Sequence, residues 1–183
     1  MDYRVQDLFT SPLWTFNLAD IDNEQLAEEG ANQVGNVDFF LAPGPTIKLL
    51  KERIEDALEI AKERYPGPPM GYRYDLTGRQ KIILPKQNDT PHHHSNSMLV
   101  GVYYVTVPKE SGDILLHDPR GAIQGKYLWG YPECIQETYQ PRPFYRIKPK
   151  PGMLIIFPGY LIHSVESNVS SEVRRSIVLT AGQ

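Results

Sequence analysis

The chain has 183 residues, of which 22% are charged and 40% are hydrophobic, and its net charge is −3. These proportions are typical of a soluble globular domain, and the scattered Lys and Arg residues give no electrostatic argument for a nucleic-acid partner. No apolar run is long enough to cross a bilayer, and the N-terminus has no signal-peptide pattern. The single cysteine, Cys134, cannot form an intrachain disulfide. We therefore expect a cytoplasmic protein without a membrane partner.

The first third of the chain is expected to be helical. Asp20 or Asp22 can cap a short helix that ends at Glu29. A longer helix is predicted over residues 47–65, with Thr46 as its N-cap and a proline-rich stop behind it. Apolar residues recur along it at helical spacing: Ile47, Leu50, Ile54, Leu58 and Ala61.

From Tyr72 onward, short β-rich runs alternate with Pro, Gly and Asn. The clearest runs are Lys81–Leu84, Met98–Val107, Asp113–His117, Phe144–Ile147, Met153–Phe157 and Ser176–Thr180. Such spacing favours an antiparallel sandwich or barrel. We therefore expect one domain over residues 1–183, with a helical buttress in residues 1–70 and a β core in residues 71–183.

The segment Pro119 to Pro143 shows little periodicity and is interpreted as a long insertion between strands. Long loops are uncommon unless they act as lids or binding surfaces, so this segment is the candidate for substrate contact. Its aromatic residues are Tyr127, Trp129, Tyr131 and Tyr139. They are equally compatible with packing inside the loop itself.

Histidines are concentrated at one place in the sequence. His92, His93 and His94 stand together, and His163 follows an apolar strand far downstream. In a strand, residues i and i+2 share a face, so His92 and His94 point one way and His93 points the other way. A ligand from a distant strand would complete a metal site, and imidazole suits Fe, Zn, Cu and Ni. A solvated loop, and a hydrogen-bonded histidine at the core edge, are the alternatives without chemistry.

Two adjacent arginines, Arg174 and Arg175, open the last predicted strand. If the stretch is extended, one of the two must face outward. A surface ion pair with the nearby Glu172 would suit that one.

Short motifs follow one another in a specific order and spacing. They are Leu8–Trp14, His92–Ser97 with Gly101–Tyr104, Asp118–Arg120, Pro151–Pro158, His163–Val165, and Arg174 with Ser176. Through this set the chain resembles, from Asp7 to Thr180, the 2-oxoglutarate- and Fe(II)-dependent oxygenases of a bacterial and phage type. The resemblance implies a mainly β fold, a double-stranded β-helix (jelly-roll, cupin-like) with N-terminal helices packed on one sheet.

The resemblance also implies roles for particular residues. His92 and His163 match the histidines that bind Fe(II), and Arg174 matches the residue that pairs with the distal carboxylate of the co-substrate 2-oxoglutarate. Ser176, two residues on and on the same face, can add a hydroxyl donor. Tyr103 is assigned to the co-substrate, and Tyr104 would then pack on the other side, although a bulge would exchange the two.

The third metal ligand departs from the usual pattern of two histidines and a carboxylate, because the carboxylate position holds His94. We expect His92, His94 and His163 to form the metal-binding and catalytic set. Asp118 is the competing ligand, and its alternative is a turn fixed by the Asp side chain.

The expected function is that of an Fe(II)- and 2-oxoglutarate-dependent oxygenase, a hydroxylase that uses O₂ on a small molecule or a protein side chain. One alternative is a three-His cupin-type dioxygenase or isomerase that does not use 2-oxoglutarate. Another is a non-catalytic jelly-roll binding module. A homodimer is left open, and no nucleic-acid partner is expected.

Overall fold

The structure is a computed structural model that describes residues 10–33, 35, 37–64, 75–120 and 144–182. Its helical elements are α1 (Asn23–Glu29), the 3-10 helix η1 (Phe39–Leu41) and α2 (Pro45–Arg64). Its strands are β1 (Trp14–Asn17), β2 (Asp75–Ile83), β3 (Asp89–His92), β4 (Ser97–Thr106), β5 (Ile114–His117), β6 (Phe144–Ile147), β7 (Met153–Pro158), β8 (His163–Val165) and β9 (Arg174–Gly182).

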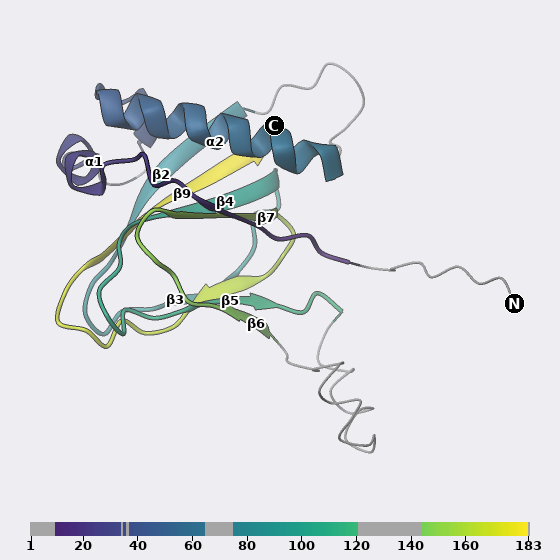
Figure 1. Cartoon of the computed structure of the whole chain (residues 1–183). Coiled ribbons are helices and arrows are strands. Elements are labelled where there is room, and N and C mark those ends of the chain that lie inside the picture. Colours follow the sequence, from purple (N-terminus) through teal and green to yellow (C-terminus); the bar gives the residue numbers. More distant parts are fainter. Residues whose placement is uncertain (1–9, 34, 36, 65–74, 121–143, 183) are drawn as a thin grey trace, which may run out of the picture.

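The described strands form two antiparallel sheets. The larger sheet has five strands in the order β1-β7-β4-β9-β2, and the smaller has four in the order β3-β8-β5-β6. Figure 1 shows the sheets as two layers, with α2 lying across the outer face of the larger sheet. This is the expected mainly β, double-stranded β-helix architecture with helices on one sheet.

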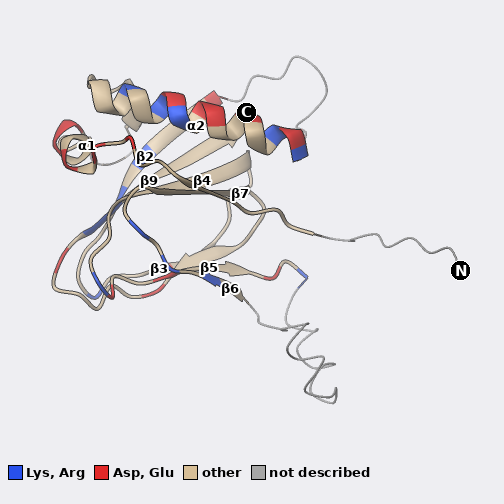
Figure 2. Cartoon of the chain, viewed as in Figure 1, with Lys and Arg blue, Asp and Glu red and all other residues tan. Residues whose placement is uncertain are grey.

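Alternate residues of β4 supply two separate apolar cores. On the helix side, β4 packs with the apolar stripe of α2: Leu99, Tyr103, Ile47, Leu50, Ile54 and Leu58. Between the sheets, β4 packs with β5 and β7: Val100, Val102, Tyr104, Leu116 and Phe157. Figure 2 shows charged residues at several positions along α2. The inner strands β4 and β7 of the larger sheet carry no charged residues. The space between the sheets is therefore a largely uncharged interior.

Both predicted helices are present, and one of them is capped differently from the prediction. Asp22 caps α1 and accepts from two backbone N–H groups of the first turn, as expected. α2 begins at Pro45, so Thr46 lies inside its first turn and is not its N-cap. The carboxylate of Glu29 caps this helix instead, by accepting from the backbone N–H groups of Thr46 and Ile47.

Each predicted strand overlaps an observed one, but β1, β3 and β8 were not predicted. β3 and β8 have only four and three residues, which is too short to show a period of two. β1 lies in the segment 1–70 that was expected to be a helical buttress, and it pairs with β7 at the edge of the larger sheet. The β core therefore also draws on the N-terminal segment.

Most of the expected insertion, residues 121–143 with Tyr127, Trp129, Tyr131 and Tyr139, lies outside the described residues. Its proposed contact with substrate stays a prediction. No helix in the described part of the chain is long and apolar enough to cross a membrane.

Candidate active site

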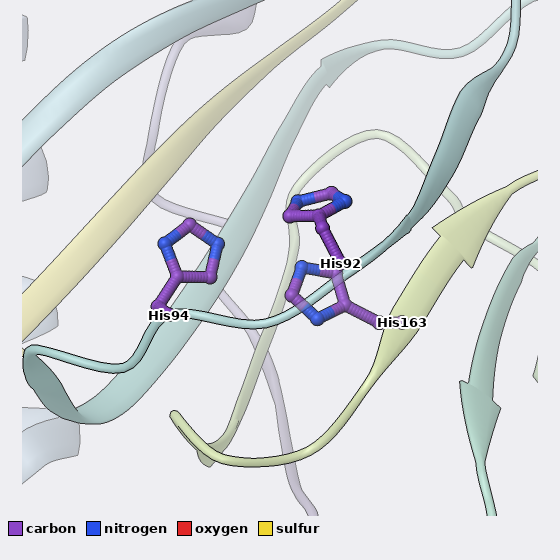
Figure 3. A group of neighbouring side chains, drawn as sticks. All are labelled: His92, His94 and His163. Atoms are coloured by element: carbon purple, nitrogen blue, oxygen red, sulfur yellow. The ribbon is translucent and has the colours of Figure 1, made fainter.

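Three histidines meet at one edge of the smaller sheet. They come from two segments whose strands, β3 and β8, pair with each other. His92 ends β3 and pairs directly with His163, the first residue of β8. His94 lies two residues further on, in the segment that leads to β4, and its backbone N–H donates to the Gly159 carbonyl. Figure 3 shows the three rings gathered at this edge. The ring centroids are 4.4 Å apart for His92 and His163, 5.3 Å for His94 and His163, and 5.4 Å for His92 and His94.

The ring nitrogens of these histidines are arranged as metal ligands would be. One nitrogen from each ring lies within 4.8 Å of the others, and in the described ranges no second group of three His, Cys, Asp or Glu residues converges in this way. The Nδ1 atoms of His92 and His163 lie 2.7 Å and 3.0 Å from the carbonyl oxygens of Thr90 and Leu161. Because a carbonyl oxygen only accepts, each Nδ1 carries the proton and each Nε2 keeps its lone pair.

The side chain of His94 gives the most direct indication that the three histidines can bind a metal ion. Its Nε2 is buried and has no hydrogen-bond partner among the described residues. Buried polar atoms are nearly always satisfied, so an orphaned imidazole nitrogen between two other imidazoles is the signature expected of a metal ligand. The set fits a divalent transition metal such as Fe(II).

Burial keeps the imidazoles of His94 and His163 in the neutral form that binds metals. The pKa of His163 is lowered to about 4, mainly by burial and to a smaller degree by the neighbouring rings of His92 and His94, against the hydrogen bond to Leu161 that raises it. Burial also lowers the pKa of His94, with smaller contributions from His92 and Arg79. Neither ring needs to lose a proton to bind a cation at neutral pH.

Arg174 is a buried cation in the same interior. It is only 1% exposed, and its guanidinium carbon lies 5.2 Å from the centre of the Tyr104 ring. Its Nη1 donates to the carbonyl oxygens of Gly112 at 2.6 Å and Ser111 at 3.4 Å, whereas its Nε has no partner among the described residues. Burial lowers the pKa of the guanidinium, and no carboxylate of the described part forms an ion pair with it. A buried cation without a counter-ion fits an anionic ligand.

Two hydroxyls accompany this guanidinium. Ser176 is 3% exposed and shares the inward face of β9 with Arg174, as expected. It is paired with Tyr104 across the β4–β9 ladder. The Tyr104 hydroxyl is buried and has no partner in the described part of the chain.

The expectation that Tyr103 faces the co-substrate is wrong. Tyr103 belongs to the core on the helix side, and its hydroxyl donates to Oδ1 of Asn23 in α1 at 2.8 Å. Tyr104 is the tyrosine beside Arg174. The sequence has no signal that would have decided between them, because β4 is buried on both faces and shows no polar alternation.

The other residues singled out in the sequence are not among the converging metal-ligand candidates. Asp118 accepts from the backbone N–H and from Nε and Nη2 of Arg120, which is the geometry of the turn alternative. His93 is exposed, in agreement with the alternation argument. His117 is hydrogen-bonded through Nε2 to Ser164.

The histidine group and Arg174 share the interior between the sheets. The Phe157 ring lies 5.0 Å from the His163 ring and belongs to the same apolar cluster as Tyr104. Phe157 is paired with Val100, and Tyr104 lies four residues further along β4 on the same face, about 13 Å away. The His163 ring contacts Phe157 at one end of this interval, and the Arg174 guanidinium contacts Tyr104 at the other.

Comparison with known proteins identifies the family. The family model described as "Putative 2OG-Fe(II) oxygenase" matches residues 81–179, which include all three histidines and Arg174. The chain belongs to this family. Its members use Fe(II) and 2-oxoglutarate.

Solved structures agree with this oxygenase fold. A prolyl-4-hydroxylase from Pseudomonas putida is similar with a TM-score of 0.62 and 15% identity, over 95% of this chain and 86% of that one. An oxidoreductase of the 2OG-Fe(II) oxygenase family from Burkholderia pseudomallei gives a TM-score of 0.52 and 14% identity, over 75% of this chain. The match spans 58% of the Burkholderia chain. No curated protein sequence matches the chain.

Proposed function

We propose that this oxygenase is an Fe(II)- and 2-oxoglutarate-dependent hydroxylase in which His92, His94 and His163 hold the metal. Arg174 binds the distal carboxylate of 2-oxoglutarate. The observation that carries the proposal is the pattern of unsatisfied groups in one interior. A neutral imidazole nitrogen lies at one end, and a buried guanidinium without a carboxylate lies at the other.

The residues of this chain have distinct tasks in the proposed reaction. When bound, Fe(II) and 2-oxoglutarate supply O₂ activation and the oxidation of a substrate C–H bond, with 2-oxoglutarate converted to succinate and CO₂. The carbonyl groups of Thr90 and Leu161 orient two of the imidazoles. Arg174 and the hydroxyls of Tyr104 and Ser176 orient the co-substrate, and the apolar residues between the sheets exclude water.

The three-histidine set makes an anionic co-substrate electrostatically favourable. Three neutral imidazoles leave Fe(II) with its full double charge, whereas a carboxylate ligand would cancel half of it. A second positive charge, that of Arg174, is buried in the same interior. A dicarboxylate that reaches both ends balances both charges.

The same charges argue against the rival functions. A three-His cupin-type enzyme that does not use 2-oxoglutarate has no need for an inward-facing, buried arginine without a counter-ion. A non-catalytic jelly-roll module would leave its histidines hydrated, but here His163 is only 4% exposed and Nε2 of His94 is buried.

The proposal is tested by anaerobic absorption spectroscopy of the purified protein. Addition of 2-oxoglutarate to the Fe(II)-loaded protein is expected to produce a metal-to-ligand charge-transfer band, and succinate, which lacks the keto group, should not. If millimolar 2-oxoglutarate produced no band, the proposed function would be overturned. If the histidines bound no metal, both enzymatic functions would fail and the binding module would remain.

A further inference from the structure

We infer that the β4–β5 turn, residues 107–113, forms the closed end of the co-substrate site, and that its Ser111 hydroxyl donates a hydrogen bond to the distal carboxylate of 2-oxoglutarate. This inference rests on the proposed function and assigns a binding role to a residue to which the sequence motifs gave none. The turn joins the strand that carries Tyr104 to the smaller sheet. It is therefore placed to reach the interior from the Arg174 end.

Ser111 is a buried polar residue without a structural partner for its side chain. It is 2% exposed, and its Oγ has no hydrogen-bond partner among the described residues. Its own backbone carbonyl lies 3.4 Å from Nη1 of Arg174, so the hydroxyl of the same residue stands close to the guanidinium. A buried serine hydroxyl normally bonds to a nearby backbone group, and here it does not.

The distribution of such orphaned atoms supports a ligand at this place. The buried side-chain atoms without a partner in the described part of the chain are Nε2 of His94, the Tyr104 hydroxyl, Oγ of Ser111 and Nε of Arg174. The first lies in the histidine group. Of the other three, Nε is part of the Arg174 guanidinium, and the other two belong to Tyr104 and Ser111, whose ring and backbone carbonyl contact that guanidinium. All three can donate. A carboxylate offers about four lone-pair sites on two oxygens, which is sufficient to accept from all of them.

The turn is held rigidly in a position that leaves these donors free. Gly112 has a φ of +91°, and a Cβ on it would lie 2.3 Å from the carbonyl oxygen of Glu166, so glycine allows the turn to press against that backbone. The backbone N–H of Ser111 donates to the Pro108 carbonyl at 3.2 Å. Nη1 of Arg174 donates to the carbonyl oxygens of Ser111 and Gly112, so Nε is the guanidinium nitrogen that is left to donate to the ligand.

The test is the affinity of Ser111→Ala for 2-oxoglutarate, measured by anaerobic titration of the charge-transfer band. We expect the dissociation constant to rise about 10- to 100-fold, because one hydrogen bond to a charged group is lost. Fe(II) affinity and the melting temperature should not fall, since the hydroxyl has no hydrogen-bond partner among the described residues. Ser171→Ala, at an exposed serine in the segment before β9, is the matched control and should bind like the wild type.

A second ligand separates a carboxylate contact from a general disturbance. 2-Oxopentanoate has the same chain length and the same chelating end as 2-oxoglutarate but lacks the distal carboxylate. Ser111→Ala should leave its weaker affinity unchanged. Wild-type affinity of Ser111→Ala for 2-oxoglutarate, or equal weakening for both ligands, would overturn the role of Ser111 while the proposed function stood. Absence of the band in the wild-type protein would overturn both.

Discussion

His92 and His163 occupy directly paired positions on β3 and β8, and each ring is bonded through Nδ1 to the carbonyl oxygen two residues before it. The acceptors are the carbonyls of Thr90 and Leu161, at 2.7 Å and 3.0 Å. The two rings are thereby fixed in the same tautomer, with centroids 4.4 Å apart. This pre-arranged pair needs only His94 to complete a three-nitrogen site.

Replacement of His92 or His163 by alanine is expected to abolish metal binding while the fold is retained. The reason is that each ring would supply one of the three proposed metal ligands, whereas the apolar cores contain no metal ligand. Isothermal titration with Mn(II) as an Fe(II) surrogate measures the loss. His93→Ala is the control, because His93 is exposed and faces away from its neighbours. Near-wild-type affinity of His163→Ala would rule out the site.

Removal of the Arg174 guanidinium is expected to weaken 2-oxoglutarate binding by about two to three orders of magnitude. Loss of one partner from a buried ion pair costs about 3–5 kcal/mol, at about 1.4 kcal/mol per decade of affinity. Arg174→Lys should recover part of the affinity as a point charge without the bidentate fork. The charge-transfer titration measures these effects, and metal affinity should hardly change. Arg175→Ala is the control, since Arg175 lies on the opposite face of β9, and a larger loss there would contradict the assignment.

The two adjacent tyrosines of β4 are expected to respond in opposite ways to loss of their hydroxyls. Tyr104→Phe should weaken 2-oxoglutarate binding about 10- to 100-fold, yet change the stability of the free protein little, because its buried hydroxyl makes no well-formed hydrogen bond among the described residues. Tyr103→Phe should leave that binding unchanged but lower the free energy of unfolding by about 1 kcal/mol, because its bond to Asn23 is lost. Chemical denaturation and the ligand titration together measure both effects. The reverse pattern would mean that β4 is rotated by one residue.

The Glu29 cap of α2 is expected to make stability depend on pH. Burial raises the pKa of this carboxyl, but hydrogen bonds from Ile47, Thr46 and Gln25 outweigh it, so the folded-state pKa lies below the ordinary value. A depressed folded-state pKa gives stability that is present above the unfolded pKa and is lost as pH falls through the folded value.

Glu29→Gln should therefore lower the free energy of unfolding by about 1 kcal/mol at neutral pH, and the difference from the wild type should shrink below about pH 4. Denaturant unfolding at several pH values measures it. Glu28→Gln, at the exposed neighbouring position, should show neither effect. A difference that stayed constant across this pH range would show that the charge of Glu29 is not what caps the helix.

Much of the fold was predictable because capping residues and the spacing of apolar residues, which are local features of the sequence, indicate helices and strands. The apolar stripe from Ile47 to Ala61 follows from helical spacing, and a cap at Asp20 or Asp22 follows from the capping preference of aspartate. The structure uses Asp22. The outward direction of His93 follows from the period of two in an extended segment. β3 and β8 could not be predicted, because strands this short are formed by their partners and not by their own sequences.

The sequence by itself determined which residue types are available for chemistry: a histidine cluster, a later histidine, and an arginine followed by Ser176. Its period-two patterns also predicted which of these side chains share a face of a strand, wherever one face of that strand is polar. Only the tertiary structure decided between Tyr103 and Tyr104, since both faces of β4 are buried and period-two patterning carries no information there. It likewise showed that the buried donors at Arg174 lack partners among the described residues. The physical reason is the same in each case: hydrogen-bond satisfaction depends on residues distant in the chain, and these meet only when the sheets close on one another.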